Sequence, residues 1–220
     1  MKKTVVVLGA NRGIGLELCR EYLADSEVIA LCRKASDELE KLDVKVIEGF
    51  DLADDNIGEK ISRELKGYQI DIFIHNAGVM ISDDLEKIDF NNIRRQFEIN
   101  TIGPLKIGKA LSTMLSSGSK IAFITSRMGS ISDNTSGGQY GYRISKSGLN
   151  SMAKSLSLDL QNKNIAVGVF HPGYVRTDMT RGSGLINADE SAQGLKKVIG
   201  NLDLKTTGGF WHSNGECLPW

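Results

Sequence analysis

Short runs of apolar, largely β-branched residues recur along the chain, and longer stretches with the spacing of amphipathic helices separate them. The apolar runs cover residues 5–8, 28–31, 44–47, 70–74, 121–124 and 165–170. The helical stretches cover residues 14–24, 54–65, 89–116, 141–162 and 189–200. Continuous apolar runs are typical of parallel strands buried on both faces, and such strands need helical crossovers. The pattern predicts an α/β fold of the Rossmann type, a doubly wound, mainly parallel sheet with helices on both faces.

Length and composition agree with a single domain over residues 1–220. One hydrophobic core can serve a chain of this size, and 40% hydrophobic and 25% charged residues are ordinary values for a globular protein. The formal net charge is +0, which provides no basic field to attract a phosphate backbone or an anionic lipid surface. We therefore expect neither nucleic acid nor a membrane among the partners.

Cysteines and apolar runs indicate the compartment. Cys19, Cys32 and Cys217 are far apart and odd in number, which fits neither a disulfide framework nor paired zinc ligands. No apolar stretch approaches the roughly 18 residues of a membrane span, and Gly9 ends the first run well short of a signal peptide. We expect a cytoplasmic protein without a metal site.

The turn after the first expected strand is rich in glycine and opens the first expected helix. It comprises Gly9, Ala10, Asn11, Arg12, Gly13, Ile14 and Gly15. Glycine permits the dihedral angles of a tight turn, and without Cβ it lets backbone N–H groups approach a pyrophosphate at the positive helix end. This context favours a dinucleotide site over a glycine turn without a ligand.

Two side chains of the expected helix at 141–162 are candidates for proton transfer. Tyr142 and Lys146 are four residues apart, so both project from one helix face. A neighbouring ammonium and an oxidised nicotinamide ring would favour the phenolate of a tyrosine, whose ordinary pKa is about 10. Ser126 directly follows the fifth expected strand, where its hydroxyl could stabilise charge developing on a substrate oxygen. A serine that only caps a loop is the alternative.

Together these motifs resemble the short-chain dehydrogenase/reductase family. The glycine turn has the GxxxGxG spacing of that family, and the segments around Ser126 and Tyr142 match its catalytic motifs in order. The resemblance runs along essentially the whole chain. The short length and the residues from Tyr142 to Asn150 are similar to the branch that contains C-factor and the sniffer carbonyl reductases.

The resemblance implies roles for further residues. Asn100 would help to hold a water that links Lys146 to solvent, with a helix cap as the rival interpretation. Lys146 would also hold the ribose hydroxyls of the nicotinamide half, together with Tyr142. Further cofactor contacts would come from Asp51, Leu52, Asn76, Ala77, Gly78, Pro172, Gly173, Val175 and Thr177.

Two of these positions and two histidines carry specific expectations. Asp51 would contact the adenine ring, and capping of the next helix is a compatible alternative. Thr177 would lie near the nicotinamide carboxamide. His75 replaces the first asparagine of the family motif before Asn76, and we expect His75 and His171 to be structural rather than catalytic.

Two arginines favour NADP(H) over NAD(H). An NAD-preferring enzyme places an acid about 20 residues beyond the glycines to bind the ribose hydroxyls. Arg33 occupies that region here, followed by Lys34, and a guanidinium can bind a 2′-phosphate through paired hydrogen bonds. Arg12 can approach the same phosphate. The alternative is that Arg33 and Lys34 are merely solvated surface charges.

We therefore expect an NADP(H)-dependent enzyme that interconverts a carbonyl and an alcohol by hydride transfer, with Tyr142 as general acid or base. An NADP-binding signalling or scaffold protein of the C-factor type is the alternative. An epimerase or dehydratase is disfavoured, because the 74 residues after Lys146 are few for the longer substrate domain of such enzymes.

Two loops and two helices complete the sequence-based expectations. The stretch at 132–141 is expected to be an active-site loop, and the short polar stretch at 180–188 suggests an open site for a small-molecule substrate. We also expect a homodimer through apolar residues of two helices. These residues are Leu105, Ala110, Leu111, Met114, Leu149, Met152, Ala153 and Leu156.

Overall fold

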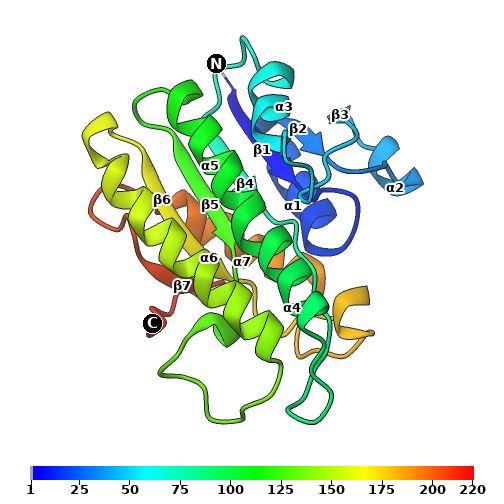
Figure 1. Cartoon of the computed structure of the whole chain (residues 1–220). Helices are drawn as coiled ribbons and strands as arrows, with labels where there is room; N and C mark the ends of the chain where they lie inside the picture. The colour runs from blue at the N-terminus through cyan, green and yellow to red at the C-terminus, as the bar shows by residue number, and fades with distance from the viewer. Residues whose placement is uncertain (1) are drawn as a thin grey trace.

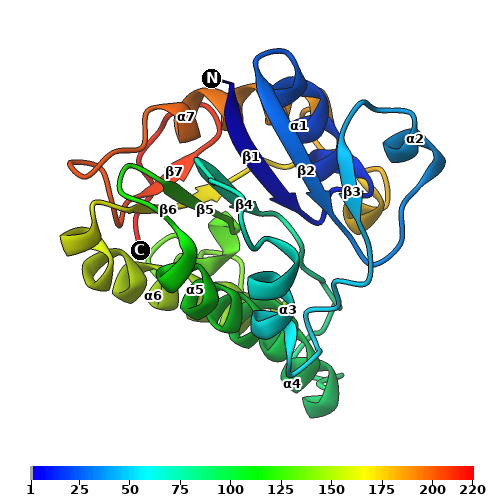
Figure 2. The same ribbon diagram turned by 90° about the horizontal axis from the view of Figure 1, so that it is seen from above.

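The computed structural model describes residues 2–220 and contains one sheet of seven parallel strands (Figures 1 and 2). The strands are β1 (Lys3–Leu8), β2 (Ser26–Leu31), β3 (Lys45–Ile47), β4 (Ile72–His75), β5 (Lys120–Ile124), β6 (Ala166–His171) and β7 (Phe210–His212). Their order in the sheet is β3-β2-β1-β4-β5-β6-β7. The chain first builds outward from β1 and then returns to β4, so the direction of winding reverses between these two strands. Ligands of such sheets bind beyond the carboxyl ends at this reversal.

Helices cover both faces of the sheet. They are α1 (Gly13–Leu23), α2 (Asp37–Glu40), α3 (Ile57–Glu64), α4 (Phe90–Phe97), α5 (Gly103–Met114), α6 (Tyr140–Asp159) and α7 (Ala188–Gly200). Figure 2 shows α1 and α7 on one face and α3, α5 and α6 on the other. The predicted doubly wound α/β fold is confirmed.

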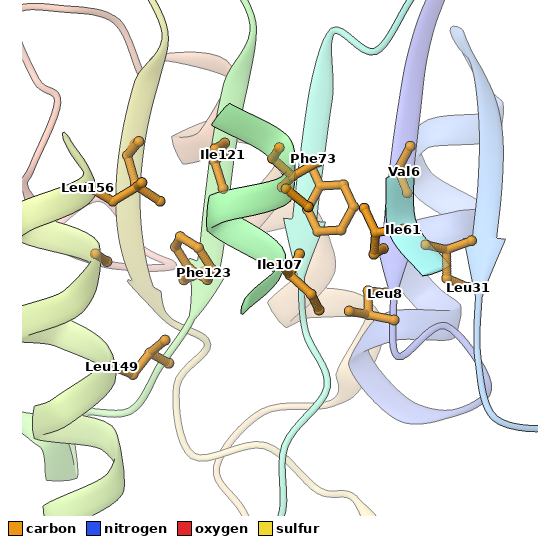
Figure 3. Close-up of a cluster of buried hydrophobic side chains, with 14 of the residues drawn as sticks. Val6, Leu8, Leu31, Ile61, Phe73, Ile107, Ile121, Phe123, Leu149 and Leu156 are labelled. Atoms are coloured by element: carbon orange, nitrogen blue, oxygen red, sulfur yellow. The ribbon is translucent and has the colours of Figure 1, made fainter. Parts of the chain in front are cut away.

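Two hydrophobic clusters hold these layers together. Successive residues of a strand point to opposite faces, so Val6 and Leu8 pack toward α3, α5 and α6 while Val5 and Val7 pack toward α1 and α7. All four are buried. Figure 3 shows the first cluster, in which Phe73 lies between the sheet and the helices. Burial on both faces is why the strands are apolar throughout rather than alternating.

The structure departs from the predicted elements in three places. The predicted helix at 89–116 is α4 and α5 joined by a π-helical turn, Glu98–Ile102. The short elements β7 and α2 were not predicted. Gly208 and Gly209 precede β7, and glycines signal a turn rather than a strand.

The apolar residues that suggested a dimer mostly belong to the core. Leu111, Leu149, Ala153 and Leu156 pack on the sheet and are buried, whereas Leu105 is 45% exposed. A sheet that is apolar on both faces needs wide apolar stripes on its covering helices, which explains the sequence pattern without a dimer. The prediction that these residues form a dimer interface is therefore wrong for most of them, and dimerisation itself stays a prediction. Within residues 2–220, no helix has the length and apolar character needed to span a membrane.

Candidate active site

The loops that leave the carboxyl ends of β1, β4, β5 and β6 gather at one edge of the molecule, the lower edge of Figure 1. Because all strands are parallel, the sheet brings segments that are distant in sequence to this common edge. The glycine turn follows β1, the segment 76–78 follows β4, Ser126 follows β5, and Pro172 follows β6. These predicted segments therefore lie along the same edge of the sheet.

Gly9 and Gly15 allow the turn after β1 to pack closely. Gly9 has φ +86, and a Cβ there would lie 2.6 Å from the backbone nitrogen of Ala77. A Cβ on Gly15 would lie 2.0 Å from the carbonyl oxygen of Gly9. The Asn76 side-chain Nδ2 donates to the same carbonyl at 3.0 Å. Two segments that were predicted to bind the cofactor thus support each other through backbone contacts that only glycine permits.

The start of α1 fits a bound anion. The N-cap residue Arg12 makes no capping hydrogen bond from its side chain, and the first turn contains no acid. Backbone N–H groups at a helix start carry partial positive charge and bind phosphate groups well. Asn11 is fixed by a hydrogen bond from the Ser36 hydroxyl to its carbonyl oxygen, 2.7 Å, while its buried Oδ1 has no hydrogen-bond partner among residues 2–220. The turn thus offers phosphate donors and one buried acceptor.

The segment after β6 closes toward the glycine turn. A Cβ on Gly13 would lie 3.4 Å from Thr177 Cγ2, so these two predicted cofactor residues are neighbours. The carbonyl oxygen of Pro172 accepts hydrogen bonds from the Ser191 and Ser213 hydroxyls at 2.7 and 3.1 Å. Gly173 has φ +93. Val175 is buried and pairs with Ile186, so this segment is held firmly in place.

The two arginines predicted to bind a 2′-phosphate are exposed. Arg12 forms an ion pair with Asp178, and both side chains are mostly solvent-accessible. Such a pair contributes about 0–1 kcal/mol and rearranges readily. Arg33 is exposed, and its carbonyl oxygen accepts a hydrogen bond from the Gly49 N–H at 3.0 Å. Neither guanidinium is fixed by burial, so both can turn toward an incoming anion.

Asp51 and Leu52 follow β3. Asp51 is exposed, and its Oδ1 accepts from the Ala53 N–H at 3.0 Å within a turn. Leu52 is buried in the core cluster that includes α3 and α5. Asp51 does not cap the next helix, because α3 begins at Ile57 with Asn56 as its N-cap residue. Contact of Asp51 with an adenine ring stays a prediction.

Tyr142 and Lys146 are almost completely buried on one face of α6, 6% and 4% exposed. The Lys146 Nζ lies 5.8 Å from the centroid of the Tyr142 ring and donates to the carbonyl oxygen of Ile124 at 3.0 Å. Among residues 2–220 this carbonyl is its one hydrogen-bond acceptor, and an ammonium has three donors. Two donors remain for a ligand.

Burial moves both pKa values away from their ordinary range. It raises the pKa of Tyr142 to about 12, and a hydrogen bond with the Ser126 side chain opposes this shift. Burial lowers the pKa of Lys146 to about 8. The expectation that Lys146 makes the phenol more acidic is not met in the protein alone, because desolvation of the phenolate is the larger effect. Tyr142 is therefore a protonated donor at neutral pH.

Ser126 both caps a turn and faces the tyrosine. Its hydroxyl accepts from the Met128 N–H at 3.2 Å at the start of a 3₁₀ turn, Arg127–Gly129. A hydrogen bond with Ser126 opposes the rise in the pKa of Tyr142. The structure confirms that Ser126 caps a turn, and its action on a substrate oxygen stays a prediction.

Asn100, in the π-helical turn, joins the loop after β4 to α6 through side-chain hydrogen bonds. Its Oδ1 accepts from the Val79 N–H at 2.9 Å, and its Nδ2 donates to the Val79 carbonyl at 2.8 Å and to the Ser145 hydroxyl at 3.0 Å. A Cβ on Gly78 would lie 3.1 Å from Asn100 Oδ1 and 3.4 Å from Lys146 Nζ. Asn100 is thus next to Lys146, within a continuous helical segment rather than at a helix cap.

Several supporting residues were missed by the sequence analysis. The carboxylate of Asp83 accepts hydrogen bonds from the backbone N–H groups of Tyr140 and Gly141 at the start of α6. The Thr125 hydroxyl donates to Asn150 Oδ1 at 2.6 Å. Asn150 could have been noticed as a polar residue among apolar positions of its helix. Asp83 has no such signal, because its contact spans 57 residues.

His75 is buried, 1% exposed, and neither ring nitrogen has a hydrogen-bond partner within residues 2–220. Burial, with a smaller contribution from Lys146, lowers its pKa to about 3. An imidazole that stays neutral and lies beneath the site agrees with the structural role expected from the sequence. His171 is similar, because burial lowers its pKa to about 3.

A cleft of about 490 Å³ lies between the loop after β4 and the loop after β6. Its lining consists of Met80, Ile81, Ser82, Tyr174, Met179, Thr180 and Arg181. The loop at 180–188, expected from the sequence to border the substrate site, contributes two of these residues. A volume of this size is typical of small-molecule sites.

The chain belongs to the short-chain dehydrogenase family. A family model described as short chain dehydrogenase matches residues 3–185, which is well over half of the chain. The resemblance drawn from the motifs is thereby confirmed. The 1-hydroxy-2-glutathionyl-2-methyl-3-butene dehydrogenase of Rhodococcus sp. (strain AD45) is 39% identical over 224 residues, covering 99% of both chains. The C-signal of Myxococcus xanthus is 38% identical over 154 residues, 69% of this chain and 93% of the relative.

Solved structures give the same assignment. The carbonyl reductase Sniffer of D. melanogaster matches with a TM-score of 0.89 at 28% identity, covering 100% of both chains. A carbonyl reductase from Pseudomonas aeruginosa PAO1 in complex with NADP matches with a TM-score of 0.88 at 30% identity, again covering 100% of both chains. The chain is thus an oxidoreductase of this family, similar in fold to carbonyl reductases.

Proposed function

We propose that the protein is an NADP(H)-dependent oxidoreductase that interconverts a carbonyl and an alcohol. The observation that carries this proposal is the buried cluster of Ser126, Tyr142 and Lys146 beside the glycine turn. Burying an ammonium and a phenol together costs free energy. Such buried groups with shifted pKa values are found most often at functional sites. A proton donor, a hydroxyl and free ammonium donors at one sheet edge supply what carbonyl reduction requires.

The residues present fit a nicotinamide dinucleotide. The α1 start and Gly13 would hold the pyrophosphate, Asn11 would use its unpartnered Oδ1, and the free donors of Lys146 would bind ribose hydroxyls. Arg33 and Arg12 would bind a 2′-phosphate, which favours NADP(H). The bound NADP of the Pseudomonas aeruginosa structure supports the same choice. We propose the remaining predicted contacts at residues 51–52, 76–78 and 172–177 as well.

When bound, the nicotinamide supplies the hydride that reaches the carbonyl carbon. The side chains of the protein manage the oxygen and the proton. Ser126 hydrogen-bonds to the substrate oxygen, and Tyr142, which is protonated at neutral pH, donates its proton there. Lys146 stabilises the resulting phenolate from its position over the ring. Asn100 keeps Val79 and Ser145 aligned around this cluster.

The test is turnover of NADPH with a panel of aldehydes, ketones and quinones, following absorbance of the reduced cofactor. The proposal predicts carbonyl-dependent oxidation of NADPH with one alcohol formed per cofactor. Absence of turnover with every member of the panel, in protein that binds NADPH, would count against it.

A second candidate, an NADP-binding signalling protein, is supported by the 38% identity to C-signal. The same panel discriminates, because a signalling protein would bind NADPH without oxidising it. Retention of Ser126, Tyr142 and Lys146 in one buried cluster favours the enzyme.

We further propose a cytoplasmic location and a homodimer. The three cysteines are free, as expected for a reducing compartment. For the dimer, Leu105 and Ile144 remain exposed on α5 and α6. Light scattering at micromolar concentration tests it, and a species of 24.0 kDa alone would exclude the dimer.

A further inference from the structure

The cleft between the loops after β4 and β6 carries an unbalanced charge. Its lining is apolar or hydroxyl-bearing except for Arg181. Arg181 forms no ion pair within residues 2–220. No acid lines the cleft, and the acids next to its lining residues are engaged elsewhere, because Asp83 binds the start of α6 and Asp178 pairs with Arg12. A cation in an apolar cleft without a partner is suited to an anionic ligand group.

The loop conformation keeps this arginine in a constrained position. Arg181 has φ +53, a left-handed conformation that non-glycine residues adopt at a cost. Its N–H donates to the Asp178 carbonyl at 3.1 Å, and the Thr180 side chain binds the Val175 carbonyl at 2.8 Å. These contacts fix the turn that carries Arg181 at the edge of the cleft.

Large apolar side chains surround the same edge. Leu85, Ile131 and Leu185, from the loops after β4, β5 and β6, are exposed although nothing in the fold requires it. Tyr174 and Met179, which line the cleft, are also exposed. Apolar groups gathered on several loops indicate a surface for an apolar ligand.

The cleft is linked directly to the catalytic helix. Asp83 immediately follows the lining residue Ser82 and accepts hydrogen bonds from Tyr140 and Gly141, the residues just before Tyr142. The part of the loop after β4 that lines the cleft is therefore followed directly by a contact with the start of α6. This contact fixes one wall of the cleft to the start of the helix that carries Tyr142.

We infer that the cleft selects carbonyl substrates with an apolar body and a carboxylate, and that Arg181 is the specificity-determining residue. This inference rests on the proposed function. The guanidinium of Arg181 would form paired, charge-assisted hydrogen bonds with the carboxylate, while Met80, Tyr174 and Met179 contact the apolar body.

The experiment compares aromatic aldehydes that carry a carboxylate with their uncharged methyl esters. 4-Formylbenzoate, 4-formylphenoxyacetate and 4-(4-formylphenoxy)butanoate are each paired with the methyl ester, so that several arm lengths are sampled. For the arm that reaches Arg181, kcat/KM should favour the acid over its ester at least about tenfold, the effect of one charge-assisted contact. High salt should reduce this ratio.

Three variants test whether Arg181 causes the preference for the acids. Arg181→Gln should bring the acid-to-ester ratio near one through a raised KM for the acid, and Arg181→Lys should keep part of the preference. Arg63→Gln changes the net charge equally on α3, away from the cleft-lining loops, and should leave the ratio unchanged. Reduction of acids and esters with equal kcat/KM, or a ratio unchanged in Arg181→Gln, overturns the inference and leaves the proposed function intact. Reduction of none of the aldehydes counts against the proposed function itself.

Discussion

The buried catalytic cluster and the exposed arginines Arg12, Arg33 and Arg181, which we call the charged rim, are held in opposite ways. Asn100, Ser126, Tyr142 and Lys146 are buried, and each has a defined hydrogen bond or ring contact. The arginines of the rim are exposed and have an ion pair at most. If both groups have their proposed roles, chemistry depends on a buried interior, whereas choice of cofactor and substrate depends on exposed charges that can change without disturbing that interior.

This contrast predicts two kinds of variant. Substitutions in the cluster should reduce turnover, and those that leave buried polar groups unpaired should also reduce stability. Substitutions in the rim should alter preference with little effect on the free energy of unfolding, as is usual for exposed residues.

The largest effect is expected from Tyr142→Phe. Phenylalanine keeps the ring but removes the proton donor, so kcat should fall by about 10² to 10⁴-fold. The dissociation constant for NADPH should change little. Steady-state kinetics and a fluorescence titration with NADPH measure the two quantities. More than about a tenth of wild-type turnover, in a reaction limited by chemistry, would show that Tyr142 is not the acid.

Asn100→Ala should lower both stability and turnover. It removes three hydrogen bonds and leaves the N–H and carbonyl of the half-buried Val79 without their partner. We expect a loss of at least about 2 kcal/mol in the free energy of unfolding. Asn91→Ala, an exposed asparagine of α4, is the matched control. Equal urea midpoints for the two variants would contradict a stabilising role for the hydrogen bonds of Asn100.

His75 should make the protein less stable in acid. Its pKa is about 3 in the folded protein, below the ordinary value of 6.5. Between these values the unfolded chain binds a proton that the folded chain does not, so stability is lost as pH falls from 6.5 toward 3. The contribution reaches about 1.4 kcal/mol per pH unit.

The measurement is the urea midpoint from pH 4 to pH 7 for the wild type and His75→Asn. The asparagine variant should show a shallower loss of stability toward low pH. Identical slopes would show that His75 is not a buried, neutral imidazole.

Arg33→Asp should reverse the choice of cofactor. The wild type should prefer NADPH over NADH by at least about tenfold in kcat/KM, because hydrogen bonds to charged groups contribute roughly 1.5 to 3 kcal/mol. The aspartate would repel a 2′-phosphate and accept ribose hydroxyls instead. The free energy of unfolding should stay within about 0.5 kcal/mol. Equal kcat/KM for both cofactors in the unmodified protein would reject this role for Arg33.

The sequence predicted the parts of the molecule that depend on local pattern. Buried parallel strands are apolar throughout, and the glycines of the first turn have conformations or contacts that only glycine tolerates, as Gly9 and Gly15 show. Spacing on one helix face placed Tyr142 and Lys146 together. The positions of these short motifs can therefore be predicted from the sequence without a structure.

What the sequence missed depends on distant contacts. Asp83 binds the start of α6 across 57 residues, and the effect of burial on Tyr142 depends on neighbours from several elements. The apolar positions of α5 and α6 suggested a partner chain because the sequence does not show how wide a stripe the sheet covers. The π-helical turn at Glu98–Ile102 interrupts no hydrophobic period, so one helix was expected.

The central claim is that this site transfers a hydride to a carbonyl carbon and that Tyr142 supplies the proton. The most direct measurement uses NADPH carrying deuterium at both C4 positions, with an aldehyde in ordinary water, and analyses the alcohol by mass spectrometry and NMR. The wild type should place one deuterium on the carbinol carbon, and Tyr142→Phe should slow its appearance by about 10² to 10⁴-fold. Alcohol without deuterium on that carbon, or labelling by Tyr142→Phe at the wild-type rate, would contradict the claim.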